Sequence, residues 1–207
     1  MNLFEETAHK ISESMQKQLA GGATQRGRPA NRDMIADYID HFGFERARAG
    51  EDFAIAVEGL ARSVETGRGV LIVGEPGCGK TTLLRALHRT RHAEISRWVP
   101  LNDYARYQMF RQNLNFYRGH NVFLDDLGTR DCTNEFGNMF NPEADFIESF
   151  HDDWQRLGCR LYATTNCNST LLMSAQKLGG RAVDRLLEMV VVVKFKGGSK
   201  REKIVVG

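Results

Sequence analysis

Residues 74–82 read GEPGCGKTT, and this stretch decides the fold. The apolar run VLIV at residues 70–73 comes directly before it, and Leu83, Leu84 and Leu87 follow it at helical spacing. A short apolar run bounded by glycine predicts a buried strand, whereas leucines three or four residues apart predict a helix. The stretch is therefore predicted to be a loop that a strand enters and a helix leaves.

The loop also fits the pattern G-x-x-x-x-G-K-[ST], which holds the phosphates of nucleoside triphosphates. Its glycines let backbone N–H groups turn toward the phosphates, while Lys80 is expected to reach the β and γ oxygens and Thr81 to offer its hydroxyl to Mg²⁺. A chance glycine-rich turn is the alternative, and the predicted strand and helix on either side argue against it. The residues predicted to bind ATP are Gly74, Glu75, Pro76, Gly77, Cys78, Gly79, Lys80, Thr81 and Thr82.

The composition of the chain is that of a globular protein. With 207 residues, of which 42% are hydrophobic, the chain is long enough for one sizeable core. Its formal net charge of +2 gives no strong positive field, so charge alone does not indicate a nucleic-acid-binding protein. The four cysteines include no CxxC pair and are interpreted as reduced thiols. No stretch has the apolar pattern of a signal peptide or a membrane span, so we expect a cytoplasmic protein with no membrane partner.

Three segments precede the predicted phosphate loop. Apolar residues every three or four positions predict an amphipathic helix near the N-terminus, at Phe4, Ala8, Ile11, Met15 and Leu19. The sequence GGATQRGRPANRD, residues 21–33, predicts a basic linker, and short helices are expected over residues 34–42 and 52–65. We therefore divide the chain into a helical N-terminal extension with a basic linker, residues 1–49, which is a candidate for docking a partner, and an ATPase domain, residues 50–207.

Apolar runs alternate with helical patterns through the ATPase domain. The predicted strands cover residues 70–73, 97–100, 121–125, 159–164 and 189–195. Strands that alternate with helices predict a parallel sheet with helices on both faces. The predicted fold class is therefore α/β, with a parallel sheet flanked by helices and a short helical N-terminal extension.

Two adjacent carboxylates end the third of these strands. The sequence NVFLDDLG, residues 121–128, places Asp125 and Asp126 directly after an apolar run. If this strand lies near the phosphate loop, one carboxylate can serve Mg²⁺ and the other can polarise the attacking water. An aspartate pair at a strand end can instead cap the next helix, but the phosphate loop earlier in the chain favours the catalytic interpretation.

Further polar groups are candidates for the same site. The strand sequence RLYATTN ends at Asn166, which could orient the lytic water or contact the γ-phosphate, although a polar residue at a strand end is most often structural. The sequence GGRAVDRLLE, residues 179–188, places Arg181 and Arg185 one turn apart on one helix face. These arginines are either a solvated charged face or an arginine finger that acts on the γ-phosphate of a neighbouring subunit. The pattern alone favours the solvated face.

The order of these motifs resembles the AAA+ ATPases of the DnaC-type helicase loaders and of their relatives, the IstB-type transposition ATPases. The similarity spans residues 50–203 and rests on FLDDLG, ATTN, LGGRAVDRL and GGSKR after the phosphate loop. This combination is far narrower than a phosphate loop alone. The resemblance implies an AAA+ P-loop NTPase core with ATP and Mg²⁺ as ligands, and a homo-oligomer that hydrolyses ATP.

The resemblance implies a role for each matching residue of the nucleotide site. Lys80 and Thr81 match the Walker A pair of the family. Asp125 matches its magnesium carboxylate and Asp126 its hydrolytic carboxylate. Asn166 matches sensor 1.

Two more arginines match functional positions of the family. Arg185 matches the finger arginine, with Arg181 as its partner. Arg201 falls where the family often carries a sensor 2 within a Ser-Tyr-Arg sequence, but this chain reads Ser199, Lys200, Arg201. That departure leaves the sensor 2 role of Arg201 open.

The sequence YARYQMFRQNLNFYRG, residues 104–119, corresponds to the region where the loaders contact single-stranded DNA. Arginines interleaved with aromatic residues can neutralise backbone phosphates while the rings stack on bases. The alternative is an amphipathic helix that uses Tyr107 and Phe110 as core anchors. The sequence does not decide between the two.

The leading hypothesis from this resemblance is an ATP-dependent helicase loader or remodeller in DNA replication, which binds single-stranded DNA and delivers a replicative helicase. A transposition ATPase that regulates a transposase on duplex DNA is the nearest alternative. A small-molecule phosphotransferase would also use a phosphate loop, but the arginine helix and the lack of an acceptor-pocket signature count against it. The sequence GCGKTT also suggests an ABC-type ATPase, although no signature like LSGGQ lies between the two Walker segments.

Overall fold

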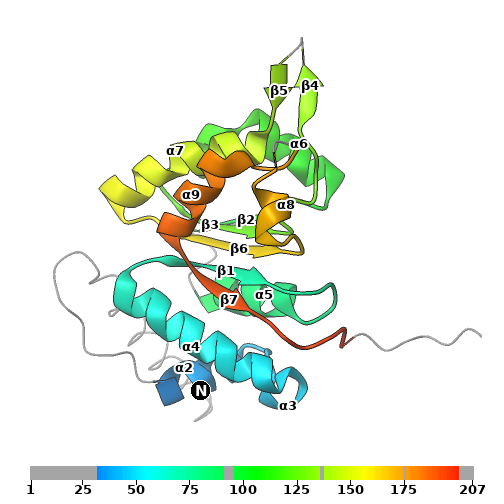
Figure 1. The fold of residues 1–207 in the computed structure, drawn as a ribbon. Coiled ribbons are helices and arrows are strands. Elements are labelled where there is room, and N and C mark those ends of the chain that lie inside the picture. The colour runs from blue at the N-terminus through cyan, green and yellow to red at the C-terminus, as the bar shows by residue number, and fades with distance from the viewer. Residues whose placement is uncertain (1–31, 91–95, 136–137, 175, 201–207) are drawn as a thin grey trace, which may run out of the picture.

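The structure is a computed structural model that describes residues 32–90, 96–135, 138–174 and 176–200 (Figure 1). The amphipathic helix predicted near the N-terminus and Arg201 lie outside these described residues. Figure 1 shows a layered arrangement in which a central sheet separates two groups of helices.

Five parallel strands form the central sheet, in the order β2-β3-β6-β1-β7. Their bounds are Gly69–Val73 for β1, Ser96–Pro100 for β2, Asn121–Asp125 for β3, Leu161–Thr165 for β6 and Val190–Lys194 for β7. Each predicted strand is present with small shifts at its ends, and the predicted α/β fold class with a parallel sheet is confirmed.

The strand order determines which strand ends meet. β6 lies between β3 and β1, so the carboxyl ends of these three strands are neighbours at one edge of the sheet. The phosphate loop follows β1, the aspartate pair ends β3, and Asn166 follows β6. The topology therefore brings the three sequence motifs to the same edge, which is where ligands bind in open α/β sheets.

Helices cover both faces of the sheet. One group shares an apolar cluster with Val70 and Ile72 of β1 and consists of α2 (Arg32–His41), α4 (Glu51–Thr66) and α5 (Lys80–Thr90). The other group shares a cluster with Leu71 and consists of α6 (Tyr104–Gln112), α7 (Pro142–Leu157) and α9 (Gly179–Met189). Successive β1 residues thus face opposite clusters, as the two-residue repeat of a strand requires. In Figure 1, α7 and α9 lie above the sheet and α2 and α4 below it.

The bounds of α7 follow from its local sequence. The side chain of Asn141 accepts hydrogen bonds from the backbone N–H groups of Glu143 and Ala144, at 2.9 and 3.1 Å, which satisfies two amides that the helix leaves unpaired. Pro142 occupies the first helical position, where its missing N–H costs nothing. Gly158, with φ +69°, ends the helix in the left-handed conformation.

The described part of the predicted N-terminal extension packs against the helices and strands around the central sheet. Residues 32–49 contain α2 and α3 (Arg46–Ala49), and both helices contact α4. The Phe44 ring between them stacks on Phe53 of α4 and on Phe195 after β7, with ring centroids 6.1 and 5.5 Å apart. The division at residues 49 and 50 remains a prediction, but residues 32–49 share the apolar cluster of the sheet.

Two small features complete the fold. The antiparallel hairpin of β4 (Thr133–Glu135) and β5 (Asn138–Phe140) projects away from the sheet in Figure 1. Two short helical turns, η1 (Leu114–Tyr117) and α8 (Ser169–Leu172), follow α6 and β6. The hairpin was not predicted, because strands of three residues are too short to show an alternating pattern.

Candidate nucleotide-binding site

The phosphate loop connects β1 to α5, as the sequence predicts. Gly77 has φ +85° and Gly79 has φ +103°, which are backbone conformations that L side chains rarely adopt. A Cβ atom at Gly77 would also lie 2.4 Å from the Oγ atom of Ser199, in the segment after β7. Gly77 and Gly79 are therefore required by the backbone conformation, and Gly77 also by the close approach of the C-terminal segment.

Lys80 is the first residue of α5, and its side chain lies over the loop. Only 4% of Lys80 is exposed, and its Nζ atom donates hydrogen bonds to the carbonyl oxygens of Gly74 at 2.8 Å and Glu75 at 2.7 Å. A buried ammonium needs oxygen partners of this kind because burial removes its water. The positive charge thus lies inside the loop that is predicted to hold the phosphates.

Asp125 connects the phosphate loop to β6. Its Oδ1 atom accepts hydrogen bonds from the hydroxyl of Thr81 at 2.9 Å and from the hydroxyl of Thr164 at 2.7 Å. The side chain is buried, and this burial raises the pKa of the Asp125 carboxyl, while the hydrogen bonds from Thr164 and Thr81 act in the opposite direction. The hydroxyl and the carboxylate predicted to bind Mg²⁺ are therefore in direct contact.

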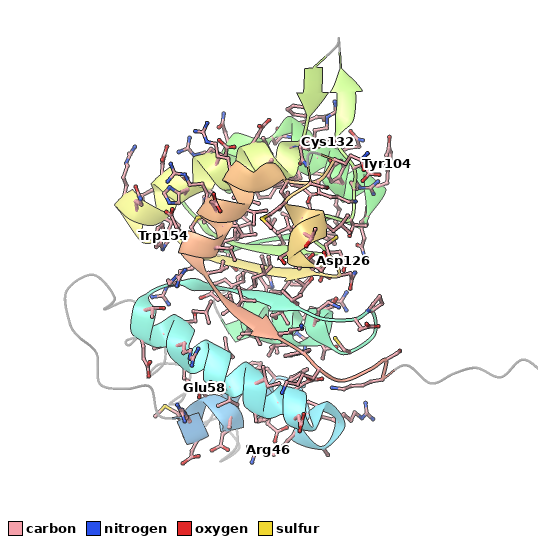
Figure 2. All side chains as sticks on the ribbon, in the orientation of Figure 1. Arg46, Glu58, Tyr104, Asp126, Cys132 and Trp154 are labelled. Carbon is pink, nitrogen blue, oxygen red and sulfur yellow. The ribbon has the colours of Figure 1, made fainter. Side chains whose placement is uncertain are left out.

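Asp126 turns away from Asp125 into a second set of contacts. Its Oδ1 atom accepts a hydrogen bond from the Asn166 amide at 3.0 Å, and its Oδ2 atom accepts one from the Asn102 amide at 2.7 Å. Asp126 has φ +66°, and no other non-glycine residue in the described ranges has a positive φ. Such a conformation costs roughly 1 kcal/mol, so the surrounding contacts must hold it. Figure 2 shows Asp126 at the edge where the strands of the sheet end.

A cavity of about 580 Å³ joins these groups. Its walls contain residues of the phosphate loop together with Asp125, Asp126 and Asn166. Ligand pockets typically have volumes of about 300–1,000 Å³, so the cavity is large enough for a nucleotide. The structure therefore brings the predicted phosphate, magnesium and water-activating residues into one pocket.

Other residues of the pocket were missed by the sequence analysis. They include Phe44, Arg48, Arg85, Asn102 and Lys200. Asn102 follows the end of β2 by two residues, so the polar residues after strand ends were a signal that could have identified it. The others come from segments whose approach to the loop depends on tertiary packing.

The segment after β7 brings Lys200 to the loop. The backbone N–H of Lys200 donates to the carbonyl oxygen of Gly77 at 3.0 Å. Its Nζ atom lies 3.2 Å from Asp52 Oδ2 and donates to the carbonyl oxygen of Ala49 at 3.1 Å. Asp52 is only 1% exposed and also accepts a hydrogen bond from the Lys196 backbone at 2.7 Å. Lys200 is thus a cation of the pocket wall next to the position predicted for sensor 2.

The arginine helix lies apart from this pocket. The described residues that line the cavity include neither Arg181 nor Arg185. Arg181 pairs with Glu148 of α7 at 3.1 Å, and the Arg185 guanidinium lies 3.7 Å from Glu188 one turn along α9. Arg181 is exposed and Arg185 is partly exposed, so within one subunit they form a charged surface. A role at the nucleotide would require a second subunit.

The segment at residues 104–119 contains both core anchors and exposed rings. Tyr107 and Phe110 are buried in the apolar cluster, as the amphipathic-helix interpretation expects. Tyr104 is 67% exposed and Phe116 57% exposed, and Figure 2 shows Tyr104 on the outer side of α6. The two interpretations of this segment are therefore compatible, because different rings face the core and the solvent.

A family model described as ABC transporter matches residues 57–177. The match covers more than half of the chain and includes the phosphate loop and the aspartate pair. The chain therefore belongs to this family of P-loop NTPases. No curated protein matches the sequence.

Several solved structures resemble this P-loop NTPase. AMPPCP-bound DnaA from Aquifex aeolicus is 18% identical with a TM-score of 0.51, and the match covers 79% of this chain and 51% of that one. A DnaC helicase loader is 20% identical with a TM-score of 0.47, and the match covers 70% of this chain and 90% of the loader. A DNA replication initiation factor is 17% identical with a TM-score of 0.49, and the match covers 70% of this chain and 46% of that one. The DnaA match shows that the two chains share a fold, although the P-loop NTPase spans only about half of the DnaA chain.

No helix in the described ranges is long and apolar enough to cross a bilayer. The same ranges contain no group of three or more His, Cys, Asp or Glu side chains that could hold a metal ion by themselves. Mg²⁺ is commonly bound by one or two protein oxygens together with nucleotide phosphates and water, so the Thr81 hydroxyl and the Asp125 carboxylate fit such a site.

Proposed function

We propose that this P-loop NTPase binds ATP with Mg²⁺ and hydrolyses the nucleotide. The observation that carries the proposal is the division of labour between the two aspartates. Asp125 contacts Thr81 of the phosphate loop, whereas Asp126 contacts Asn166 on the neighbouring strand end. Thr81 and Asp125 would hold the metal, which neutralises phosphate charge when bound, and Asp126 with Asn166 would orient and polarise the lytic water.

We further propose that the hydrolysis serves an ATP-dependent helicase loader that assembles as a homo-oligomer on single-stranded DNA. The motif order from the phosphate loop to the arginine helix supports this role through its resemblance to the DnaC-type loaders. In such an assembly Arg185 of one subunit would reach the nucleotide of the next subunit. The exposure of Arg185 on α9 is compatible with that arrangement.

The outer surface of α6 and η1 supports the DNA part of the proposal. The Arg97 guanidinium lies 4.6 Å from the centre of the exposed Phe116 ring, and the Arg130 guanidinium lies 5.5 Å from the Tyr104 ring. Exposed rings that carry cations provide stacking surfaces for bases next to charges for phosphates. This pairing of ring and guanidinium suits an unpaired strand better than a duplex, whose bases are already stacked.

Binding of labelled oligonucleotides tests this surface. We expect Phe116→Ala to weaken binding of single-stranded DNA about tenfold, because base–aromatic stacking contributes about 1–3 kcal/mol per base. Leu157→Ala is the matched control, since Leu157 is 59% exposed but lies at the end of α7. Unchanged binding of single-stranded DNA by the Phe116 variant would show that η1 does not contact the DNA.

Capture of a protein partner tests the loader role. The purified chain with ATP should retain the replicative helicase of its host and prefer single-stranded over duplex DNA. Asp126→Asn should trap the captured state, because it is expected to keep ATP bound. Retention of a transposase together with a preference for duplex DNA would support the transposition ATPase instead.

A further inference from the structure

Glu143 is a buried carboxyl that the proposed chemistry does not use. It is the second residue of α7 and is only 1% exposed, and burial raises its pKa to about 7. An acidic residue in the first turn of a helix is usually exposed and favoured by the helix dipole, and Asp145 in the same turn is exposed. The burial of Glu143 therefore calls for a partner beyond its own helix.

That partner is the loop after β3. The Oε2 atom of Glu143 accepts a hydrogen bond from the Gly128 N–H at 2.7 Å. The Oε1 atom is buried and has no hydrogen-bond partner among the described residues, so the Gly128 contact is what offsets the burial of the carboxyl. Gly128 has φ +76°, and a Cβ atom there would lie 2.6 Å from the side chain of Leu172. The loop is thus closely packed where Glu143 holds it.

The same loop carries Asp126 two residues earlier. Leu127 donates its N–H to the Thr164 carbonyl oxygen at 2.8 Å, which holds the loop from β6. Glu143 holds the next residue, Gly128, from α7. Two successive anchored residues leave Asp126 little freedom to relax from its left-handed conformation, which points its carboxylate at Asn166.

We propose that Glu143 is a positioning residue that keeps Asp126 oriented toward the nucleotide, through its hydrogen bond to the Gly128 amide. The inference rests on the proposed ATP hydrolysis and assigns Glu143 no contact with the reacting atoms. Loss of the acceptor oxygen would leave a buried amide unpaired and release the loop. Turnover would then fall, while ATP binding through Lys80 and the phosphate loop would persist because those groups lie on β1 and α5.

Two variants of similar length test the acceptor oxygen. Glu143→Gln keeps an oxygen that can accept from the Gly128 amide, whereas Glu143→Met does not. We expect Glu143→Met to lower kcat about tenfold to a hundredfold, as small displacements of catalytic groups do. ATP affinity should stay within about twofold, and Glu143→Gln should restore most of the turnover. Asp145→Asn, an exposed change in the same helical turn, is the control and should leave both quantities unchanged. Equal losses in the Gln and Met variants, or parallel losses of affinity and turnover, would overturn the proposal.

The Gly128 amide gives a readout that does not require hydrolysis. In the NMR spectrum of the full-length chain, its signal should move with pH around a midpoint of about 7 and should stop moving in the Glu143→Gln variant. The charged and titratable groups that face Glu143 are Lys177, Arg130 and Tyr107. Burial, with the nearby Glu143 carboxylate, raises the pKa of Tyr107 to about 12, well above that midpoint. A signal that stays fixed between about pH 5 and pH 9 overturns the Glu143 contact. A wild-type chain that hydrolyses no ATP overturns the proposed function itself, and the amide titration distinguishes the two failures.

Discussion

The Oγ1 atom of Thr81 lies 2.9 Å from Oδ1 of Asp125, so the first turn of α5 and the last residue of β3 share a hydrogen bond across 44 residues of sequence. The contact exists because β1 and β3 both pair with β6, which places the start of α5 beside the end of β3. The proposed metal ligands are therefore positioned by the strand order of the sheet.

The two aspartates should separate binding from turnover. Asp126→Asn should keep Mg²⁺-dependent ATP affinity but slow hydrolysis by about a hundredfold or more, because it removes the proposed base without touching Thr81. Asp125→Asn should lose the Mg²⁺-dependent part of the affinity. Titration of a fluorescent ATP analogue with and without Mg²⁺, alongside phosphate release, measures both effects. If Asp126→Asn loses affinity and keeps turnover, the roles of the two carboxylates are reversed.

Lys80→Ala should weaken ATP binding about tenfold to a hundredfold. The change removes a charge-assisted contact to the phosphates, each of which is worth about 1.5–3 kcal/mol. The variant should remain folded, since the Lys80 ammonium bonds loop carbonyls rather than the apolar core. Lys196→Ala, an exposed lysine after β7, is the control. Undiminished ATP binding in Lys80→Ala would contradict the phosphate-loop assignment.

The sequence predicted the parts of the site that are encoded locally. The glycine pattern of the phosphate loop and the apolar run before Asp125 each lie within about ten residues of sequence. The strands and the loop between β1 and α5 could therefore be predicted from the sequence. The α/β fold class followed from the alternation of strands and helices. These features depend on residue types and their spacing, which are visible in the sequence itself.

The rest of the pocket depends on contacts between distant segments. Lys200 reaches the phosphate loop because Asp52, about 150 residues earlier, holds the backbone after β7. Glu143 looks like an ordinary acidic residue in the first turn of α7 until its burial and its contact with Gly128 are known. No local pattern distinguishes such residues, because their neighbours are set by packing of the sheet against both helical layers.

Arg185 should act on the nucleotide of a neighbouring subunit. Its exposed contact with Glu188 contributes little stability, so Arg185→Ala should leave the melting temperature nearly unchanged. If Arg185 is an arginine finger, the variant should lose about 10³-fold or more of its turnover. Mixing it with Lys80→Ala subunits should restore some activity, because a shared interface then has one intact loop and one intact arginine.

Two results would contradict the arginine-finger role and leave Arg185 as a residue of the charged surface. One is undiminished hydrolysis by Arg185→Ala, and the other is no recovery in mixtures that are shown to co-assemble. Arg62→Ala is the matched control, because Arg62 forms a similar exposed pair with Glu58 on α4 at 3.3 Å. That variant should behave as the wild type in both assays.

Lys200→Ala should weaken nucleotide binding about fivefold, which corresponds to roughly 1 kcal/mol. The Lys200 ammonium lies on the pocket wall and is held by Asp52, so its removal takes positive charge from the cavity and leaves a buried carboxylate with fewer partners. Isothermal titration with ATP and ADP measures the loss, and Lys200→Arg should restore part of it. Equal affinity in Lys200→Ala would limit Lys200 to a structural contact with Asp52.

Stability should depend on pH through Glu143. Burial raises the pKa of this carboxyl from its ordinary value of 4.5 to about 7, so between these values the folded chain holds a proton that the unfolded chain has released. The resulting stabilisation is fully present below about pH 4.5 and is lost as the pH rises through about 7. It amounts to at most roughly 3 to 4 kcal/mol, since each pKa unit corresponds to about 1.4 kcal/mol.

The difference between the wild type and Glu143→Gln isolates this contribution, because the other titrating groups are common to both chains. Chemical denaturation at about pH 5 and pH 8 should show the wild type losing stability relative to the glutamine variant as the pH rises. Asp145→Asn keeps Glu143, so it should lose stability relative to Glu143→Gln in the same direction as the wild type. A wild type that gains stability relative to Glu143→Gln at the higher pH would mean that the ionised carboxylate is the favoured form, and that the hydrogen bond from Gly128 outweighs the cost of burial.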